Sequence, residues 1–243
     1  MKIADCEVTL IDSMGTDISV VNADRVSFHK ESGYLYDEDD PTIEYLSEKD
    51  QKLLKYLADH NHILPFSHAF LSFRIKAPIF IARQLAKHQV GLCWNEVSRR
   101  YVDEEPEFFM PKTWRKKADN IKQGSSEEVV IFKNNAEDYH TCPGEKHNPP
   151  FIENLLESYL HLYTYLIETK KVCPEQARMI LPQNMMTEWI WSGSLLAFIR
   201  VCNLRLDPHT QKETQDVAKQ IAYYLDQRFP NSWEVSKKYI ENI

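Results

Sequence analysis

The chain has 243 residues, of which 43% are hydrophobic and 27% charged, and its formal net charge is −7. This apolar content can bury a core, and with only six glycines it excludes a disordered or fibrous protein. The negative charge speaks against a nucleic-acid-binding module, because such proteins gain affinity through a broad basic surface. A local basic cluster on such a chain indicates a smaller anion, such as a nucleotide.

The five cysteines are widely spaced and form no CxxC pair. This usage indicates reduced thiols, with neither a disulfide framework nor a zinc site. The first residues, "MKIADCEVTLID", carry acids where a signal peptide would be apolar, and no long apolar run follows. We therefore expect a cytoplasmic protein (in the host cytoplasm if the source is a virus) without a membrane segment.

The first third of the chain contains alternating strands and helices. Residues 6–12 alternate and predict a strand, and a loop with a short helix follows over 13–28. An amphipathic helix is predicted over 44–60, with Ser47 as its N-cap and Asp50 three residues further on.

The clearest strand is predicted over 66–75, where apolar residues alternate with polar ones. Pro78 suits the first position of a helix, which we expect to extend to residue 89. On that helix the spacing of four residues predicts one polar stripe of Arg83, Gln84, Lys87 and His88.

The later chain is mainly helical. Residues 112–150 are polar and predict a variable loop region around a short strand at 128–132. Helices are then predicted over 151–170, 174–182, 187–205 and 208–228. Early strands followed by late helices predict a single α+β domain over 1–243, with a small antiparallel or mixed sheet and several long helices.

Cations gather in the stretch "ARQLAKHQVGLCWNEVSRRY", residues 82–101. Ser98, Arg100 and nearby backbone amides could hold a phosphate, since arginine supplies forked donors. Asn95 and Glu96 could read the edge of a ring. The alternative is that the basic stripe is a solvated helix face.

Two other polar stretches are candidates. His62 lies in a histidine-rich segment without a carboxylate or cysteine set, so we expect no metal there, and a hydrogen-bonding role or surface exposure instead. Arg205 ends one predicted helix and His209 falls in the first turn of the next, where amides attract anions. Arg205 could instead cap the preceding carbonyls, and Arg178 could be a surface cation.

Four ordered stretches together resemble the flavin-dependent thymidylate synthases. The signature of that family is Arg-His-Arg, seven residues and Ser, and here the chain has "KHQVGLCWNEVSRRY". The stretches "LIDSMGTDISVVNADRVSF", "ARMILPQN" and "NLRLDPHTQKETQ" also match, in the family's order. The resemblance covers most of the chain except about 112–150. No dinucleotide-binding or P-loop fingerprint is present, so nucleotide chemistry would require a less common fold such as this one.

The resemblance implies reductive methylation of dUMP to dTMP. Methylenetetrahydrofolate would donate the carbon and NADPH the electrons, through FAD bound at the subunit interfaces of a homotetramer. Arg205 and Ser98 would be the catalytic residues, with Arg205 favouring ionisation of the pyrimidine at N3. The dUMP-binding residues would be Gln84, Lys87, Glu96, Ser98, Arg100, Arg178 and Arg205.

The flavin site carried over from the family differs from its usual composition. The FAD-binding residues would be Ser27, His62, Lys87, His88, Gln89, Asn95, Glu96, Ser194, Arg200 and His209. Lys87 and Gln89 replace the two arginines of the signature, and the spacer to Ser98 has eight residues instead of seven. Lysine keeps a point charge without the fork, and glutamine loses the charge. The alternative function is therefore a nucleotide-binding homologue with weakened or lost flavin catalysis.

Overall fold

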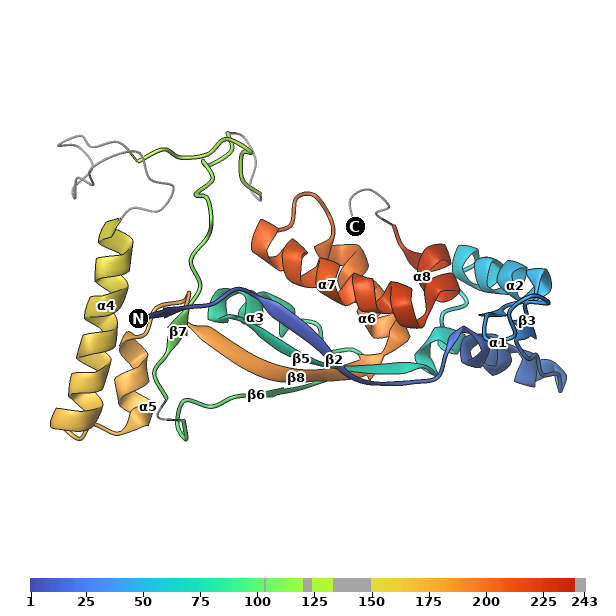
Figure 1. Cartoon of the computed structure of the whole chain (residues 1–243), viewed down its shortest axis with the longest axis horizontal. Coiled ribbons are helices and arrows are strands. Elements are labelled where there is room, and N and C mark those ends of the chain that lie inside the picture. The colour runs from blue at the N-terminus through green and yellow to red at the C-terminus, as the bar shows by residue number, and fades with distance from the viewer. Residues whose placement is uncertain (103, 120–123, 133–149, 239–243) are drawn as a thin grey trace. The chain divides into compact units, whose positions relative to one another are not determined.

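The computed structural model describes residues 1–102, 104–119, 124–132 and 150–238 (Figure 1). No helix in these ranges is both long and apolar enough to cross a membrane. The strands are β1 (Lys2–Ile3), β2 (Glu7–Met14), β3 (Leu35–Tyr36), β4 (Glu44–Tyr45), β5 (Phe70–Pro78), β6 (Leu92–Glu96), β7 (Glu107–Phe108) and β8 (Met186–Ser194). The helices are α1 (Asp17–Arg25), α2 (Glu48–Asp59), α3 (Ile79–Leu85), α4 (Pro150–Thr164), α5 (Pro174–Ala177), α6 (Leu195–Arg205), α7 (Lys212–Arg228) and α8 (Pro230–Ser236).

The main sheet has four strands in the order β2-β5-β8-β6. Two small sheets accompany it, a parallel pair of β1 with β7 and an antiparallel pair of β3 with β4. This combination of small sheets and several helices confirms the predicted α+β fold.

The predicted helix over 187–205 is wrong in its first half. Met186–Ser194 forms β8, in which buried residues such as Trp189 and Trp191 alternate with half-buried ones. The helix begins only after Ser194, whose side-chain oxygen accepts a hydrogen bond from the Ala197 N–H at 3.3 Å. A continuous apolar run does not distinguish a buried strand from a helix. Here residues 186–194 form a strand because they pair within the main sheet.

Three other predicted elements are corrected. The helix expected over 78–89 ends at Leu85, so Lys87 and His88 do not share a helical face with Arg83. The last long helix begins at Lys212 instead of 208. The stretch 128–132 forms an isolated bridge, between Val129 and Arg115, and not a strand.

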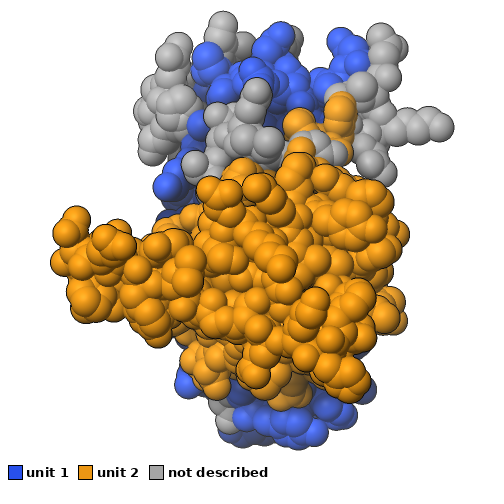
Figure 2. All heavy atoms as spheres, turned by 90° about the vertical axis from the view of Figure 1, so that its right-hand side faces the viewer, with its two compact units in different colours: residues 1–7, 76–85, 96–189 blue, residues 8–75, 86–95, 190–243 orange. Residues whose placement is uncertain are grey.

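The chain folds into two compact units, coloured separately in Figure 2. Unit 1 comprises residues 1–7, 76–85 and 96–189, and unit 2 comprises 8–75, 86–95 and 190–243. Each unit therefore collects segments that are distant in sequence. The single domain expected from the sequence stays a prediction.

Unit 2 has an aromatic core between strand and helix residues. Phe73 of β5 is fully buried and meets Phe198 of α6 edge to face, with 4.9 Å between ring centroids. Trp191 of β8 packs against the same Phe198 ring at 5.4 Å. α7 contributes buried apolar residues along one face, including Ile221 and Leu225. Burial of such side chains, at about 1.5–3 kcal/mol each, stabilises this unit.

Unit 1 has its own smaller core. Phe108, Met110, Leu156 and Met185 are buried together, with half-buried apolar side chains around them. The β1–β7 pair continues at its end through a hydrogen bond from the Ala4 N–H to the Phe108 carbonyl at 3.0 Å.

Candidate functional site

The signature stretch turns sharply in unit 2 after α3 ends. Gly91 has φ of 75°, a left-handed conformation that favours glycine. Its carbonyl accepts a hydrogen bond from the Ser194 N–H at 3.2 Å. At Gly193 a Cβ atom would lie 2.3 Å from the same carbonyl oxygen, so this approach requires glycine. Two glycines thus hold the turn against the start of α6.

The same turn places His88 next to Arg205, the last residue of α6. The Arg205 Nε–H donates to Nε2 of His88 at 3.0 Å. Because that ring nitrogen accepts, His88 is neutral here and carries its proton on Nδ1. Burial, and secondarily the charge of Arg205, lower the pKa of His88 to about 4. Burial also lowers the pKa of Arg205.

Two tryptophans pack beside this pair. The Trp191 ring centroid lies 6.5 Å from that of His88 and 5.5 Å from that of Trp94. Trp191 is fully buried, and its Nε1 has no hydrogen-bond partner among the residues that the structure describes. No sequence pattern indicated that Trp191 would pack beside His88, since about one hundred residues separate them.

The other unit 2 candidates differ in their surroundings. Lys87, Gln89, Asn95 and Arg200 are all exposed. Ser27 is exposed in a 3-10 turn after α1. His62 is exposed, and its ring is nearly perpendicular to that of Tyr56, with 5.7 Å between the centroids. These side chains are accessible, as residues that bind a ligand must be.

Ser194 and His209 have local partners. The Ser194 hydroxyl caps α6, as described above, and the residue is buried. His209 is exposed and precedes α7, whereas we had expected it in the helix's first turn. Its N–H donates to Asp207 Oδ1 at 2.8 Å, and its ring Nδ1 lies 3.0 Å from the same oxygen. Asp207 therefore organises this turn ahead of α7.

In unit 1, Ser98 and Arg100 form a local pair. The Arg100 Nε–H donates to Ser98 Oγ at 3.0 Å, and its guanidinium lies 5.1 Å from the Tyr101 ring centroid. The structure thus brings together the two residues that the sequence predicted for phosphate binding. A hydroxyl and a guanidinium held side by side suit a phosphate.

Glu96 is oriented by a residue that the sequence did not single out. Thr187 is buried, and its hydroxyl donates to Glu96 Oε1 at 2.7 Å. The Val97 N–H also donates to the Glu188 carbonyl at 2.8 Å. Of the remaining unit 1 candidates, Gln84 is half-buried on α3 and Arg178 is exposed just after α5. No sequence pattern could link Thr187 to Glu96, because only strand pairing brings them together.

The residues present fit an anionic, aromatic-ring cofactor such as FAD. Lys87 and Arg200 supply exposed cations for a pyrophosphate, and Gln89 and Asn95 supply amide donors and acceptors. All four lie in unit 2. The donor set is therefore compatible with the flavin that the resemblance implies.

The fold is that of a known nucleotide methylase. The chain superimposes with a TM-score of 0.76 on PolB from Streptomyces cacaoi, a UMP/dUMP methylase solved with 5-Br dUMP. The match covers 97% of this chain and 96% of that one, at 24% identity.

Sequence similarity to known proteins is informative about the family as well as the fold. The chain is 33% identical to the flavin-dependent thymidylate synthase of Thermosipho africanus, over 95% of this chain and 90% of that protein. It is 32% identical to an enzyme of the same name from Thermus thermophilus, over 96% of this chain and 76% of that protein. The family model described as thymidylate synthase complementing protein matches residues 9–231. The chain therefore belongs to the flavin-dependent thymidylate synthase family.

Proposed function

We propose that this protein converts dUMP to dTMP. Methylenetetrahydrofolate donates the one-carbon group and NADPH supplies the electrons through FAD. Because the reductant is NADPH, the folate leaves as tetrahydrofolate. The proposal rests on membership of the family and, within the chain, on the hydrogen bond that holds Arg205 against neutral His88.

Arg205 acts on the pyrimidine in this proposal. A guanidinium at the ring stabilises negative charge developing at N3, and this polarises C5 for attack on the one-carbon unit. His88 occupies the Arg205 Nε–H and so restricts the rotation of the guanidinium. A side chain fixed in advance incurs less reorganisation cost at the moment of reaction.

Five of the seven predicted dUMP residues lie in unit 1. Ser98 and Arg100 contact the phosphate, and Arg178 joins them from another subunit of a homotetramer. Glu96, oriented by Thr187, accepts from a ring N–H or ribose hydroxyl, and Gln84 contributes an amide. Arginine is suited to phosphate because its donors are planar and forked.

Nine of the ten predicted FAD residues lie in unit 2, and the tenth, Glu96, lies in unit 1. Lys87 and Arg200 would supply positive charge for the pyrophosphate, while Ser27, His62, His88, Gln89 and Asn95 would contact the rest of the cofactor. Ser194 and His209 belong to the same predicted set. When bound, FAD supplies the hydride equivalent that completes the methyl group.

Cys202 of α6 does not suit a covalent mechanism. Cys202 is fully buried, burial raises the pKa of its thiol, and the thiol donates weakly to the Ala218 carbonyl at 3.7 Å. A buried protonated thiol is a poor nucleophile.

The test is release of tritium from dUMP labelled at C5, with NADPH and methylenetetrahydrofolate, with and without added FAD. We expect release that depends on FAD. Absence of release would refute the proposal, with a reaction that lacks the protein as the background control.

A second candidate is a nucleotide-binding homologue with weakened flavin catalysis. The observation that favours it is the replacement of two signature arginines by Lys87 and Gln89, both on the exposed turn. Tight dUMP binding without FAD binding or tritium release would support this candidate.

A further inference from the structure

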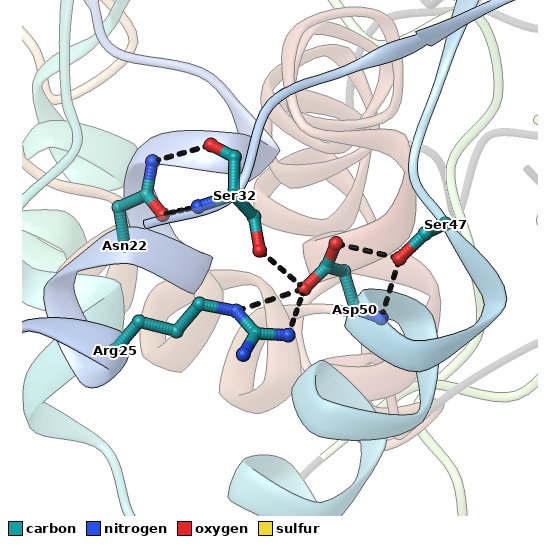
Figure 3. Close-up of polar contacts among 5 residues, drawn as sticks. All are labelled: Asn22, Arg25, Ser32, Ser47 and Asp50. Atoms are coloured by element: carbon teal, nitrogen blue, oxygen red, sulfur yellow. Dashed lines mark hydrogen bonds and ion pairs between the residues drawn. The ribbon is translucent and has the colours of Figure 1, made fainter. Parts of the chain in front are cut away.

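A buried carboxylate joins three segments of unit 2 near the predicted flavin residue Ser27. Asp50 lies in the first turn of α2 and is only 3% exposed. Figure 3 shows it between the end of α1, the loop at Ser32 and the N-cap Ser47. A charge is seldom buried to this extent unless donors surround it.

Both carboxylate oxygens of Asp50 are occupied. Oδ1 accepts from the Arg25 Nε–H and the Ser32 hydroxyl, each at 3.0 Å, and Arg25 Nη2 also contacts this oxygen. Oδ2 accepts from the Ser47 hydroxyl at 2.6 Å. The Asp50 N–H in turn donates to Ser47 Oγ at 3.2 Å, which is the N-cap bond of α2.

Asn22 fixes the same loop from another side. Its Nδ2 donates to the Ser32 carbonyl at 3.0 Å, and its Oδ1 accepts from the Ser32 N–H at 2.7 Å. Ser32 is thus bound through its main chain by Asn22 and through its side chain by Asp50 (Figure 3).

These contacts hold residues 26–31 at both ends. Arg25 precedes this segment and Ser32 follows it, and both bind the same Asp50 oxygen. Inside the segment, the Lys30 N–H donates to the Arg25 carbonyl at 3.2 Å, and His29 adopts a left-handed φ of 55°. The turn is therefore closed at its base.

The base of the turn is buried while its tip is exposed. The side chains of Arg25 and Asp50 are 12% and 4% exposed, but Val26 and Phe28, which flank Ser27, are 67% and 66% exposed. Burial acts to raise the pKa of Asp50, but hydrogen bonds from Ser47, Arg25 and Ser32 and the charge of Arg25 outweigh it, so the pKa is lowered. The carboxylate is therefore the form that holds the turn at neutral pH.

We propose that Asp50 is a positioning residue that fixes the turn of residues 26–31 and thereby presents Ser27 to the flavin. The link to flavin rests on the proposed function, whereas the fixing of the turn does not. If the turn is already ordered before FAD binds, no binding energy is used to order it. A substitution that disorders the turn therefore weakens FAD affinity, even though no atom that contacts FAD is removed.

The test compares Asp50→Asn with a matched control, Asp17→Asn. Asp17 is another buried carboxylate of unit 2, at the opposite end of α1. It accepts from the Asn231 N–H and Nδ2 at 2.9 and 3.0 Å and from the Ser232 N–H at 2.9 Å, all at the start of α8. Both substitutions remove a buried charge at nearly constant size, but only one releases the turn. Ser32→Ala is a milder variant that keeps Asp50 and its pairing with Arg25.

Two readouts are measured on each variant that retains the wild-type circular dichroism spectrum. One is hydrogen exchange by mass spectrometry of peptides covering 26–31 in FAD-free protein, and the other is the FAD dissociation constant from flavin fluorescence. We expect Asp50→Asn to speed amide hydrogen exchange in residues 26–31. We also expect it to raise the FAD dissociation constant about 10-fold, the effect of one lost hydrogen bond. Ser32→Ala should show the same pattern to a smaller degree. Asp17→Asn should leave both readouts within about 2-fold, as expected for sites without shared partners.

Unchanged exchange in 26–31, or an equal rise in Asp17→Asn, would overturn the proposal. Faster exchange with unaltered FAD affinity would overturn the link to flavin. If wild-type protein bound no FAD, the flavin assignment itself would fail, while hydrogen exchange would still decide whether Asp50 fixes the turn.

Discussion

Acidification should destabilise this protein through one histidine. The hydrogen bond from Arg205 requires a neutral His88, and the pKa of His88 falls from its ordinary 6.5 to about 4. As the pH decreases through this window, the unfolded chain takes up a proton that the folded chain does not. The free energy of unfolding therefore decreases from pH 6.5 down to about 4, and this contribution is constant below that.

The size of the effect follows from the same values. A difference of about 2.5 pH units, at 1.36 kcal/mol per unit, gives an upper bound of about 3.4 kcal/mol. His88 is only half-buried, so solvent screening reduces this to about 1–2 kcal/mol. Protonation of His88 would disturb its hydrogen bond with the Arg205 guanidinium and, with it, the turn around Gly91.

The assay is urea unfolding of wild type and His88→Gln at intervals between pH 4.5 and 7.5. Glutamine keeps an acceptor for Arg205 and cannot titrate, so its stability should decrease less with acid, by about 1–2 kcal/mol across the window. His209→Gln, which removes an exposed imidazole, controls for the loss of one histidine. Identical pH slopes for wild type and His88→Gln, or an NMR titration of the His88 ring near pH 6.5, would refute the reasoning.

Three further substitutions test the site and its support. Arg205→Ala should lower turnover about 10²–10³-fold while flavin stays bound, because charge stabilisation at the pyrimidine is lost. Formation of dTMP within a few-fold of wild type would contradict this role. Gln89→Arg restores a signature arginine and should increase FAD affinity or leave it unaltered, as measured by flavin fluorescence. A large decrease in FAD affinity would mean that the pocket geometry differs from that of the family. Gly193→Ala should lower the free energy of unfolding by about 1–3 kcal/mol, because its Cβ would lie 2.3 Å from the Gly91 carbonyl; urea denaturation with an unchanged midpoint would argue against this close approach.

Contacts between residues close in sequence were predictable from motifs. Ser98 and Arg100 are two residues apart and form the expected pair. Ser47 caps α2 as its spacing to Asp50 predicted. The family itself was recognisable from four short stretches, because they occur together and in the family's order.

Secondary structure was least predictable where burial is nearly complete. The stretch 187–194 is apolar enough for a buried helix or a central strand, and only its pairing in the main sheet selects β8. The end of α3 was also missed, since no proline or glycine marks residue 86, and the turn depends on Gly91 meeting Gly193 about one hundred residues later.

The sequence alone determined the class of fold and the family, and it predicted the candidate residues of the site, since these depend on residue type and short-range spacing. Tertiary structure decided which groups act on one another. Arg205 meets His88 across 117 residues, Thr187 meets Glu96 across 91, and Asp50 joins Arg25 and Ser32 across 25 and 18. Such contacts leave no periodic trace in the chain, because they form only when packing of strands and helices brings distant side chains within hydrogen-bonding distance.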